Sequence, residues 1–71
     1  MKLNVARVNE LIENKFGNNQ TKFANAINAD RTYLNRVLRN NGYGAGAIIC
    51  GGIIKYCDEH KLNYKDYIFF E

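Results

Sequence analysis

The sequence predicts an all-α domain, a small bundle of about five helices, and three observations support this class. Apolar side chains recur at steps of three or four residues in several segments, which is the period of an amphipathic helix. Asn, Asp and Gly stand between these segments, where helices begin and end. The chain has no proline, so no residue disrupts a helix interior in that way. A length of 71 residues with 46% hydrophobic residues fits one globular domain spanning residues 1–71.

Residues 4–16 are expected to form the first helix. Asn4 can cap its start, and Gly17 can end it because glycine adopts the left-handed backbone found at helix C-termini. One face carries apolar side chains at helical spacing: Val5, Val8, Ile12 and Phe16. We expect this face to pack behind the next two helices and to complete a three-helix core.

The stretch from Gln20 to Leu38 is expected to form two short helices joined by a tight turn. The first helix runs from Gln20 to Ile27 and the second from Arg31 to Asn40. Each has one apolar face, formed by Phe23, Ala24 and Ile27 in the first and by Leu34, Val37 and Leu38 in the second. Asn28 tolerates the left-handed backbone that a tight turn needs, and Asp30 can cap the second helix. From this pattern alone, a helical hairpin in any small bundle is the alternative.

The same stretch resembles the helix-turn-helix of the phage Cro and lambda-repressor-like (XRE-type) transcriptional regulators, here over residues 20–39. The residues that match the family pattern are Gln20, Phe23, Ala24, Ile27, Leu34 and Val37. Two positions depart from it, because the turn glycine is Asn28 and the branched apolar residue after it is Ala29. The resemblance implies a lambda-repressor-like DNA-binding domain whose partner is double-stranded DNA.

Under this resemblance, the outer side of the helix that begins at Arg31 enters the major groove. Arg can donate two parallel hydrogen bonds to guanine, Asn can pair similarly with adenine, and Thr can place its methyl group against thymine. The candidate base-reading residues are Arg31, Thr32, Tyr33, Asn35 and Arg36. For Tyr33, four roles stay open: stacking, a contact to a thymine methyl, a bond to phosphate, and a place at the edge of the core.

A second set of polar residues is expected to contact the phosphate backbone. Helix N-termini favour phosphate because their free N–H groups and positive dipole end point outward. The candidate phosphate-binding residues lie on the first turn of the second helix and around the end of the third: Gln20, Thr21, Lys22, Arg39, Asn40, Asn41 and Tyr43.

The distribution of charge agrees with this placement. Residues 20–41 contain four basic side chains against one acidic side chain, a net charge of +3, whereas residues 42–71 contain three against four, a net charge of −1. A polyanion is therefore attracted to the first segment and repelled by the second. The same four basic residues could instead form an ordinary solvated face, so charge alone leaves both interpretations open.

Residues 47–61 are expected to form a fourth helix, with Gly51 and Gly52 in its interior. Each glycine costs about 1 kcal/mol of helix stability relative to alanine. We hypothesise that another helix compensates by approaching closely, either from within the domain or from a second subunit. The preceding run NNGYGAGA lacks the Gly-Lys-Ser/Thr signature of a nucleotide-binding loop.

The side chains that could perform catalysis are sparse. Cys50 and Cys57 lie two helical turns apart, too far for a disulfide within one helix, and we interpret them as small core residues. His60 is the only histidine, and the chain contains no serine. No metal-site spacing is present. The sequence therefore predicts no enzyme, no cofactor, no metal and no small-molecule substrate.

The C-terminal helix and apolar tail together cover residues 47–70. Asn63 can cap a last helical turn from Tyr64 to Phe69, or else the YIFF segment forms an extended strand. Part of the tail should fill the core, and the candidate dimer-contact residues are Tyr67, Ile68, Phe69 and Phe70. A two-fold homodimer would set two recognition helices ~34 Å apart and imply a palindromic operator.

These observations predict a sequence-specific transcriptional regulator, a Cro-like phage or mobile-element repressor that acts by promoter occlusion. No apolar run approaches the ~20 residues of a membrane span, and the N-terminus lacks a signal-peptide core, so no membrane partner and a cytoplasmic location are expected. The alternative is a protein-binding module on the same fold, an antitoxin or anti-repressor. Such a module would bury Tyr33 and the aromatic tail in its partner.

Overall fold

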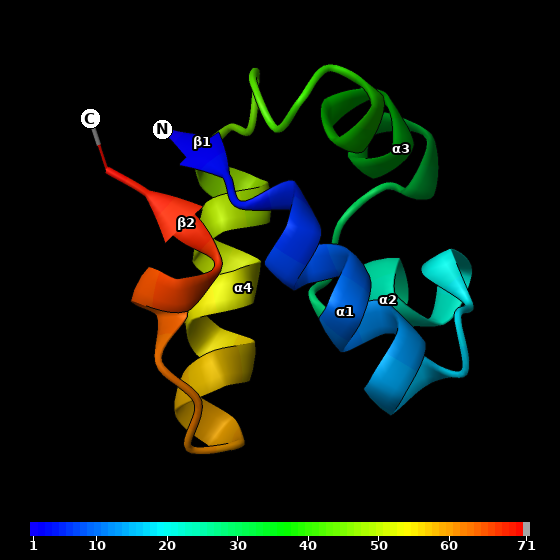
Figure 1. Cartoon of the computed structure of the whole chain (residues 1–71), viewed down its shortest axis with the longest axis vertical. Helices are drawn as coiled ribbons and strands as arrows, with labels where there is room; N and C mark the ends of the chain where they lie inside the picture. Colours follow the sequence, from blue (N-terminus) through cyan, green and yellow to red (C-terminus); the bar gives the residue numbers. More distant parts are fainter. Residues whose placement is uncertain (71) are drawn as a thin grey trace.

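Four α-helices dominate the computed structural model, which describes residues 1–70 of the chain (Figure 1). They are α1 (Val5–Phe16), α2 (Gln20–Ala26), α3 (Arg31–Arg39) and α4 (Ala47–Glu59). Two short strands, β1 (Lys2–Leu3) and β2 (Ile68–Phe69), bring the two ends of the chain together, and a single 3-10 turn (Tyr64–Asp66) precedes β2.

Each of the four helices begins at or next to the predicted residue, whereas α2, α3 and α4 end one or two residues earlier than predicted. Each of the first three starts after a residue whose side chain accepts a hydrogen bond from a backbone N–H three residues later: Asn4, Asn19 and Asp30. Gly17 and Asn28 adopt left-handed backbone, with φ of 58° and 61°, and so reverse the chain after α1 and α2. The roles predicted for Asn4, Gly17, Asn28 and Asp30 are therefore confirmed.

The predicted inner faces of the helices form the core. Phe23 on α2 is fully buried and packs edge-on against Phe16 of α1, with ring centroids 5.3 Å apart. On its other side lies Tyr56 of α4, at 6.5 Å. One aromatic cluster therefore joins α1, α2 and α4, and α3 adds Leu34, Val37 and Leu38 to the same core.

The two glycines of α4 differ in their surroundings. A Cβ atom on Gly52 would overlap the backbone carbonyl of Ile27, so α4 passes directly against the end of α2. This confirms the predicted close approach, and it comes from within the domain. A Cβ atom on Gly51 would meet no atom of residues 1–70 within 4 Å, and Gly51 lies exposed on the outer side of α4.

The N-terminal strand is a feature that the sequence did not predict. Lys2 pairs with Phe69 and Leu3 with Ile68 in an antiparallel ladder, and the Leu3 side chain is fully buried. A strand of two residues is too short for the alternation of apolar and polar side chains to be recognised in the sequence.

The tail corrects two expectations. The last helical turn ends at Asp66 instead of reaching Phe69, because β1 offers a pairing partner and the backbone becomes extended, which was the alternative for YIFF. Tyr67 and Ile68 are buried in the core, so their side chains do not lie on the surface as dimer contacts. Phe69 and Phe70 remain 43% and 50% exposed.

Candidate nucleic-acid interface

The outer side of α3 gathers most of the residues predicted to read bases. Leu34, Val37 and Leu38 turn inward, which leaves the opposite side of this nine-residue helix to polar side chains. Arg31, Thr32 and Arg36 are exposed, whereas Asn35 is half-buried. A shallow depression runs along this side and is lined by Thr32, Asn35, Arg36, Arg39 and Asn40. The structure thus brings base-reading and phosphate-binding candidates together on one surface.

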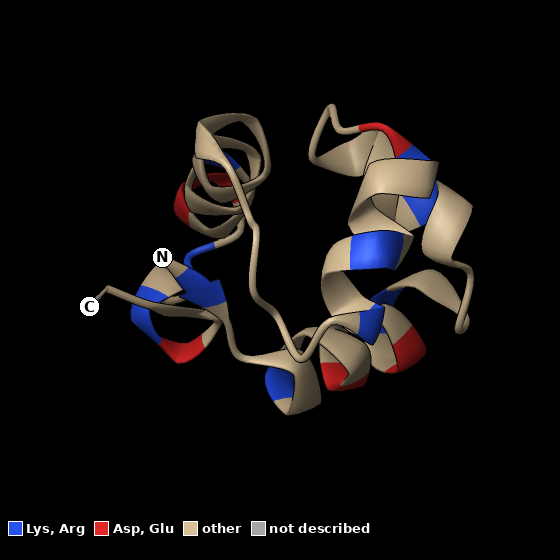
Figure 2. Ribbon diagram, turned by 90° about the horizontal axis from the view of Figure 1, so that it is seen from above, with Lys and Arg blue, Asp and Glu red and all other residues tan. Residues whose placement is uncertain are grey.

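This surface carries positive charge that the rest of the molecule does not neutralise. Within residues 1–70, no carboxylate lies within 4.0 Å of Lys22, Arg31, Arg36 or Arg39, because both ion pairs of this part involve Arg7. The nearby carboxylate of Asp30 accepts the backbone N–H of Tyr33 at 3.0 Å. Figure 2 looks down onto the upper edge of Figure 1, and there the basic segments follow α3 on the right. These cations are available to an external anion.

A side-chain hydrogen bond fixes the position of α3 against α2. The amide of Asn35 donates to Oε1 of Gln20 at 3.0 Å, and both residues are half-buried. Gln20 therefore orients a predicted base reader, a role that the sequence analysis did not assign. Within residues 1–70, the amide nitrogen of Gln20 makes no hydrogen bond, so it can donate to a ligand, as can the exposed hydroxyl of Thr21 and ammonium of Lys22.

Tyr33 has a structural contact that none of its four predicted roles included. Its hydroxyl donates to the backbone carbonyl of Gly44 at 2.5 Å, eleven residues further along the chain. The ring stands at the edge of the interface with 36% of its surface exposed. Tyr33 thus braces the loop after α3, and its hydroxyl is occupied while that bond persists.

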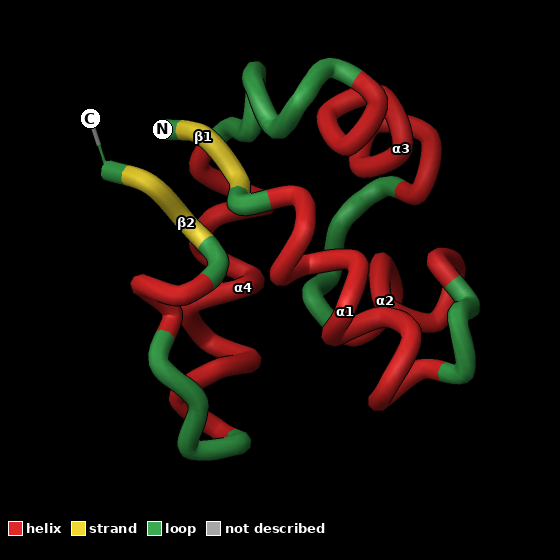
Figure 3. The backbone as a smooth tube through the Cα atoms, in the orientation of Figure 1, coloured by secondary structure: helices red, strands yellow, loops and turns green. Residues whose placement is uncertain are grey.

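The loop from Asn40 to Gly46 crosses from α3 to α4 along the same edge of the molecule (Figure 3). The backbone N–H of Gly42 donates to Val37 at 2.9 Å, and the carbonyl of Gly42 accepts from Leu3 at 2.9 Å. A Cβ atom on Gly42 would overlap the Leu3 backbone, and its φ is +87°, so glycine is required here. Asn40, Asn41 and Tyr43 are exposed on this fixed loop.

Comparison with known proteins does not identify a family for this chain. Models of protein families, curated proteins and solved structures were compared with the chain. None of them matches it.

The thiols of Cys50 and Cys57 are buried, which confirms them as small core residues, and burial raises the pKa of each. In residues 1–70, no group of three or more His, Cys, Asp or Glu side chains is arranged to hold a metal ion. Nor does any helix in this part combine the length and apolar character needed to cross a bilayer.

Proposed function

We propose that this protein binds double-stranded DNA sequence-specifically through the outer side of α3 and regulates transcription as a Cro-like repressor. One observation carries the proposal. Three arginines project from α3 without a carboxylate partner in residues 1–70, beside Thr32 and Asn35, while the opposite side of the helix fills the core. Arg, Asn and Thr are the residue types that read base edges in the major groove.

The size of α3 also supports the proposal. An α-helix with its side chains is about 10–12 Å in diameter, and the major groove is about 12 Å wide, so a helix such as α3 fits into it. Arg31, Thr32, Asn35 and Arg36 would face bases. Lys22 on the first turn of α2, and Arg39, Asn40 and Asn41 at the end of α3, would contact the phosphate backbone.

The first experiment is selection of bound duplexes from a random DNA pool at two salt concentrations, followed by fluorescence anisotropy on the selected sequence. We expect enrichment of one sequence, and log K falling linearly with log salt by about 0.9 per phosphate contact. A purified protein that does not bind duplex DNA even at low ionic strength would contradict the proposal.

Two variants separate base reading from phosphate binding. Arg36→Ala should weaken the binding free energy for the selected duplex by about 1–3 kcal/mol and relax the sequence preference at one base pair. Arg39→Gln should weaken binding to every sequence alike and reduce the salt slope by about one. Lys65→Gln, on the 3-10 turn near the other end of the molecule, is the matched control for loss of one positive charge. If all three variants behave alike, this division of roles is wrong.

The proposed bound form is a homodimer on a palindromic operator. Exposure of Phe69 and Phe70 beside the β2 edge supports a contact between two copies. Analytical ultracentrifugation with and without operator tests this, and Phe70→Ser should weaken the dimer. Full-affinity binding of one copy to a single half-site would contradict it.

A second candidate function is a protein-binding module of the antitoxin or anti-repressor type. The observation that favours it is the apolar exposed surface away from α3, namely Ile48 at 71%, Phe69 and Phe70. The salt titration distinguishes the two functions, because such a module would show little salt-dependent affinity for DNA.

A further inference from the structure

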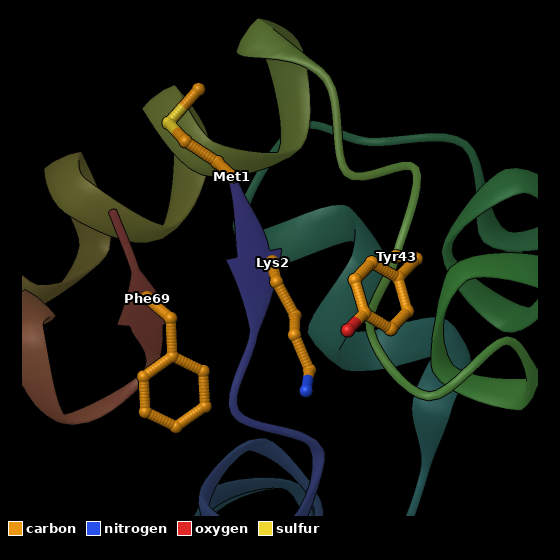
Figure 4. A pocket seen from close by; sticks show the side chains of 4 residues that line it. All are labelled: Met1, Lys2, Tyr43 and Phe69. Atoms are coloured by element: carbon orange, nitrogen blue, oxygen red, sulfur yellow. The ribbon is translucent and has the colours of Figure 1, made fainter. Parts of the chain in front are cut away.

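The N-terminal strand carries a cation that no sequence pattern pointed to. The ammonium of Lys2 lies 4.7 Å from the centre of the Tyr43 ring and 5.7 Å from the centre of the Phe69 ring. Figure 4 shows Lys2 between these two rings, with the Tyr43 hydroxyl on the side toward the ammonium. Together with Met1 they line a pocket of about 360 Å³ that opens to solvent.

The Lys2 side chain is held by aromatic faces instead of a carboxylate. Within residues 1–70, no Asp or Glu oxygen lies within 4.0 Å of its ammonium. Cation–π contacts restrict a lysine side chain while leaving its charge uncompensated, so the three N–H donors stay available to an anion. Lys2 is also only half-buried, and an approaching ligand can therefore reach it.

The backbone couples Lys2 to α3. Lys2 forms a bridge with Tyr43 on one side of β1, and the ladder to Phe69 flanks the other side. The next residue donates its N–H to Gly42, which in turn donates to Val37 of α3 at 2.9 Å. Tyr33 fixes the same loop through Gly44. In Figure 1, β1, the loop and α3 follow one edge of the molecule, and Figure 2 looks down on that edge.

We infer that Lys2 is a phosphate-binding residue and that Tyr43 and Phe69 are the positioning residues that hold it. The ligand is a backbone phosphate of the duplex that α3 occupies, so the inference rests on the proposed function. The interface then extends from α3 across the Asn40–Gly46 loop to the N-terminal strand. Phe69 acts here through Lys2 of the same chain and needs no second copy.

The test compares Lys2→Gln with Lys2→Arg and with the control Lys65→Gln in salt titrations on the selected duplex. Loss of one phosphate contact lowers the salt slope by about 0.9. The variant should then bind about eightfold more weakly than wild type at 0.1 M salt and almost as tightly as wild type at 1 M salt. Lys2→Arg keeps the charge and should keep the slope, and Lys65→Gln should also leave it unchanged. Tyr43→Leu should reduce the slope in wild type but add nothing in the Lys2→Gln background.

A second measurement uses the wild-type protein and so does not depend on any variant folding. Bound duplex should protect Lys2 from acylation by a soluble amine-reactive ester, read by mass spectrometry, while Lys65 stays reactive. Wild-type protein that binds DNA with Lys2 unprotected and with an unchanged slope in Lys2→Gln would overturn this inference alone. Wild-type protein that does not bind duplex DNA at low salt would overturn the proposed function itself.

Discussion

The α2–α3 half and the α4–tail half of the molecule are built alike on the inside and differ on the outside. Each buries one apolar helix face in the common core. The outer side of α3 presents arginines with Thr32 and Asn35, whereas the outer side of α4 presents Ile48, an open Gly51 and a mixture of Lys55 with two acidic residues. The inner faces form the common core, and the outer faces differ in charge and polarity.

The two halves also hold their helices in different ways. Polar side chains position α3: Asp30 caps its start, Asn35 bonds Gln20, and Tyr33 bonds Gly44. Among the residues that the structure describes, no side chain caps α4, which begins after Gly46. Instead, Gly52 lets its backbone lie against Ile27. Substitutions in α3 should therefore remove individual hydrogen bonds, whereas substitutions in α4 should force whole helices apart.

The largest expected effect is on the free energy of unfolding, which alanine should lower at one glycine of α4 and raise at its neighbour. Gly52→Ala places a methyl group on the Ile27 carbonyl, and such overpacking costs about 1–3 kcal/mol of unfolding free energy. Gly51→Ala has open space and should gain about 0.5–1 kcal/mol through helix propensity. Thermal denaturation measures both, at roughly 4–8 °C per kcal/mol for a domain of this size.

The two glycine variants serve as each other's controls, because they carry the same chemical change one position apart. If both destabilise the protein equally, Gly51 also has a close neighbour, and the contrast between the inner and outer sides of α4 fails. Equal gains would mean that α4 does not lie against Ile27.

The sequence predicted the four helices because their signals are local. Caps such as Asn4 and Asp30 act within one turn, and apolar spacing shows which side of a helix is buried. The N-terminal strand escaped prediction, because pairing of Lys2 with Phe69 joins residues at opposite ends of the chain. The residues that pair with β2 lie in β1, a segment with no strand pattern in the sequence. This pairing is also the reason that the 3-10 turn ends at Asp66 and does not reach Phe69.

The candidate site was predictable in part. The spacing of Leu34, Val37 and Leu38 predicted which side of α3 faces outward, and so which side chains are exposed. The contacts of Gln20 with Asn35 and of Tyr33 with Gly44 were not predictable. They join side chains from different elements, and one sequence does not report their distances. Lys2 was missed for the same reason, since only the folded chain sets it between two aromatic rings.

The hydrogen bond from Asn35 to Gln20 connects α3 with α2 and should contribute to stability. A net contribution of about 0.5–1.5 kcal/mol is typical of such a bond. Gln20→Ala and Asn35→Ala should each lower the unfolding free energy by about that amount, and the double variant should lose about as much as either single one. Urea denaturation of the four proteins measures the coupling. Strictly additive losses would show that the two side chains act independently.

The smallest expected effect is a loss of stability at alkaline pH, caused by the thiols, which both lie in the α4 half. Burial raises the pKa of Cys57 from its ordinary value of 9.0, and the carboxylate of Asp66 raises it further. At pH 9.0 the unfolded chain has lost half of this proton while the folded chain keeps more of it, so the unfolded state binds fewer protons and stability falls as pH rises. The loss at that pH is at most RT ln 2, about 0.4 kcal/mol per thiol.

Urea denaturation between pH 7.5 and 9.5, with a reducing agent present, measures this loss. Cys57→Ala should be less stable than wild type at every pH because it leaves a small cavity, but its stability should depend less on pH. The Arg39→Gln variant, changed on the outer side of α3, should follow the wild-type pH dependence. Parallel curves for wild type and Cys57→Ala would mean that the thiol ionises as readily in the folded chain as in the unfolded one. The core of α4 would then admit water, unlike the core beneath α3.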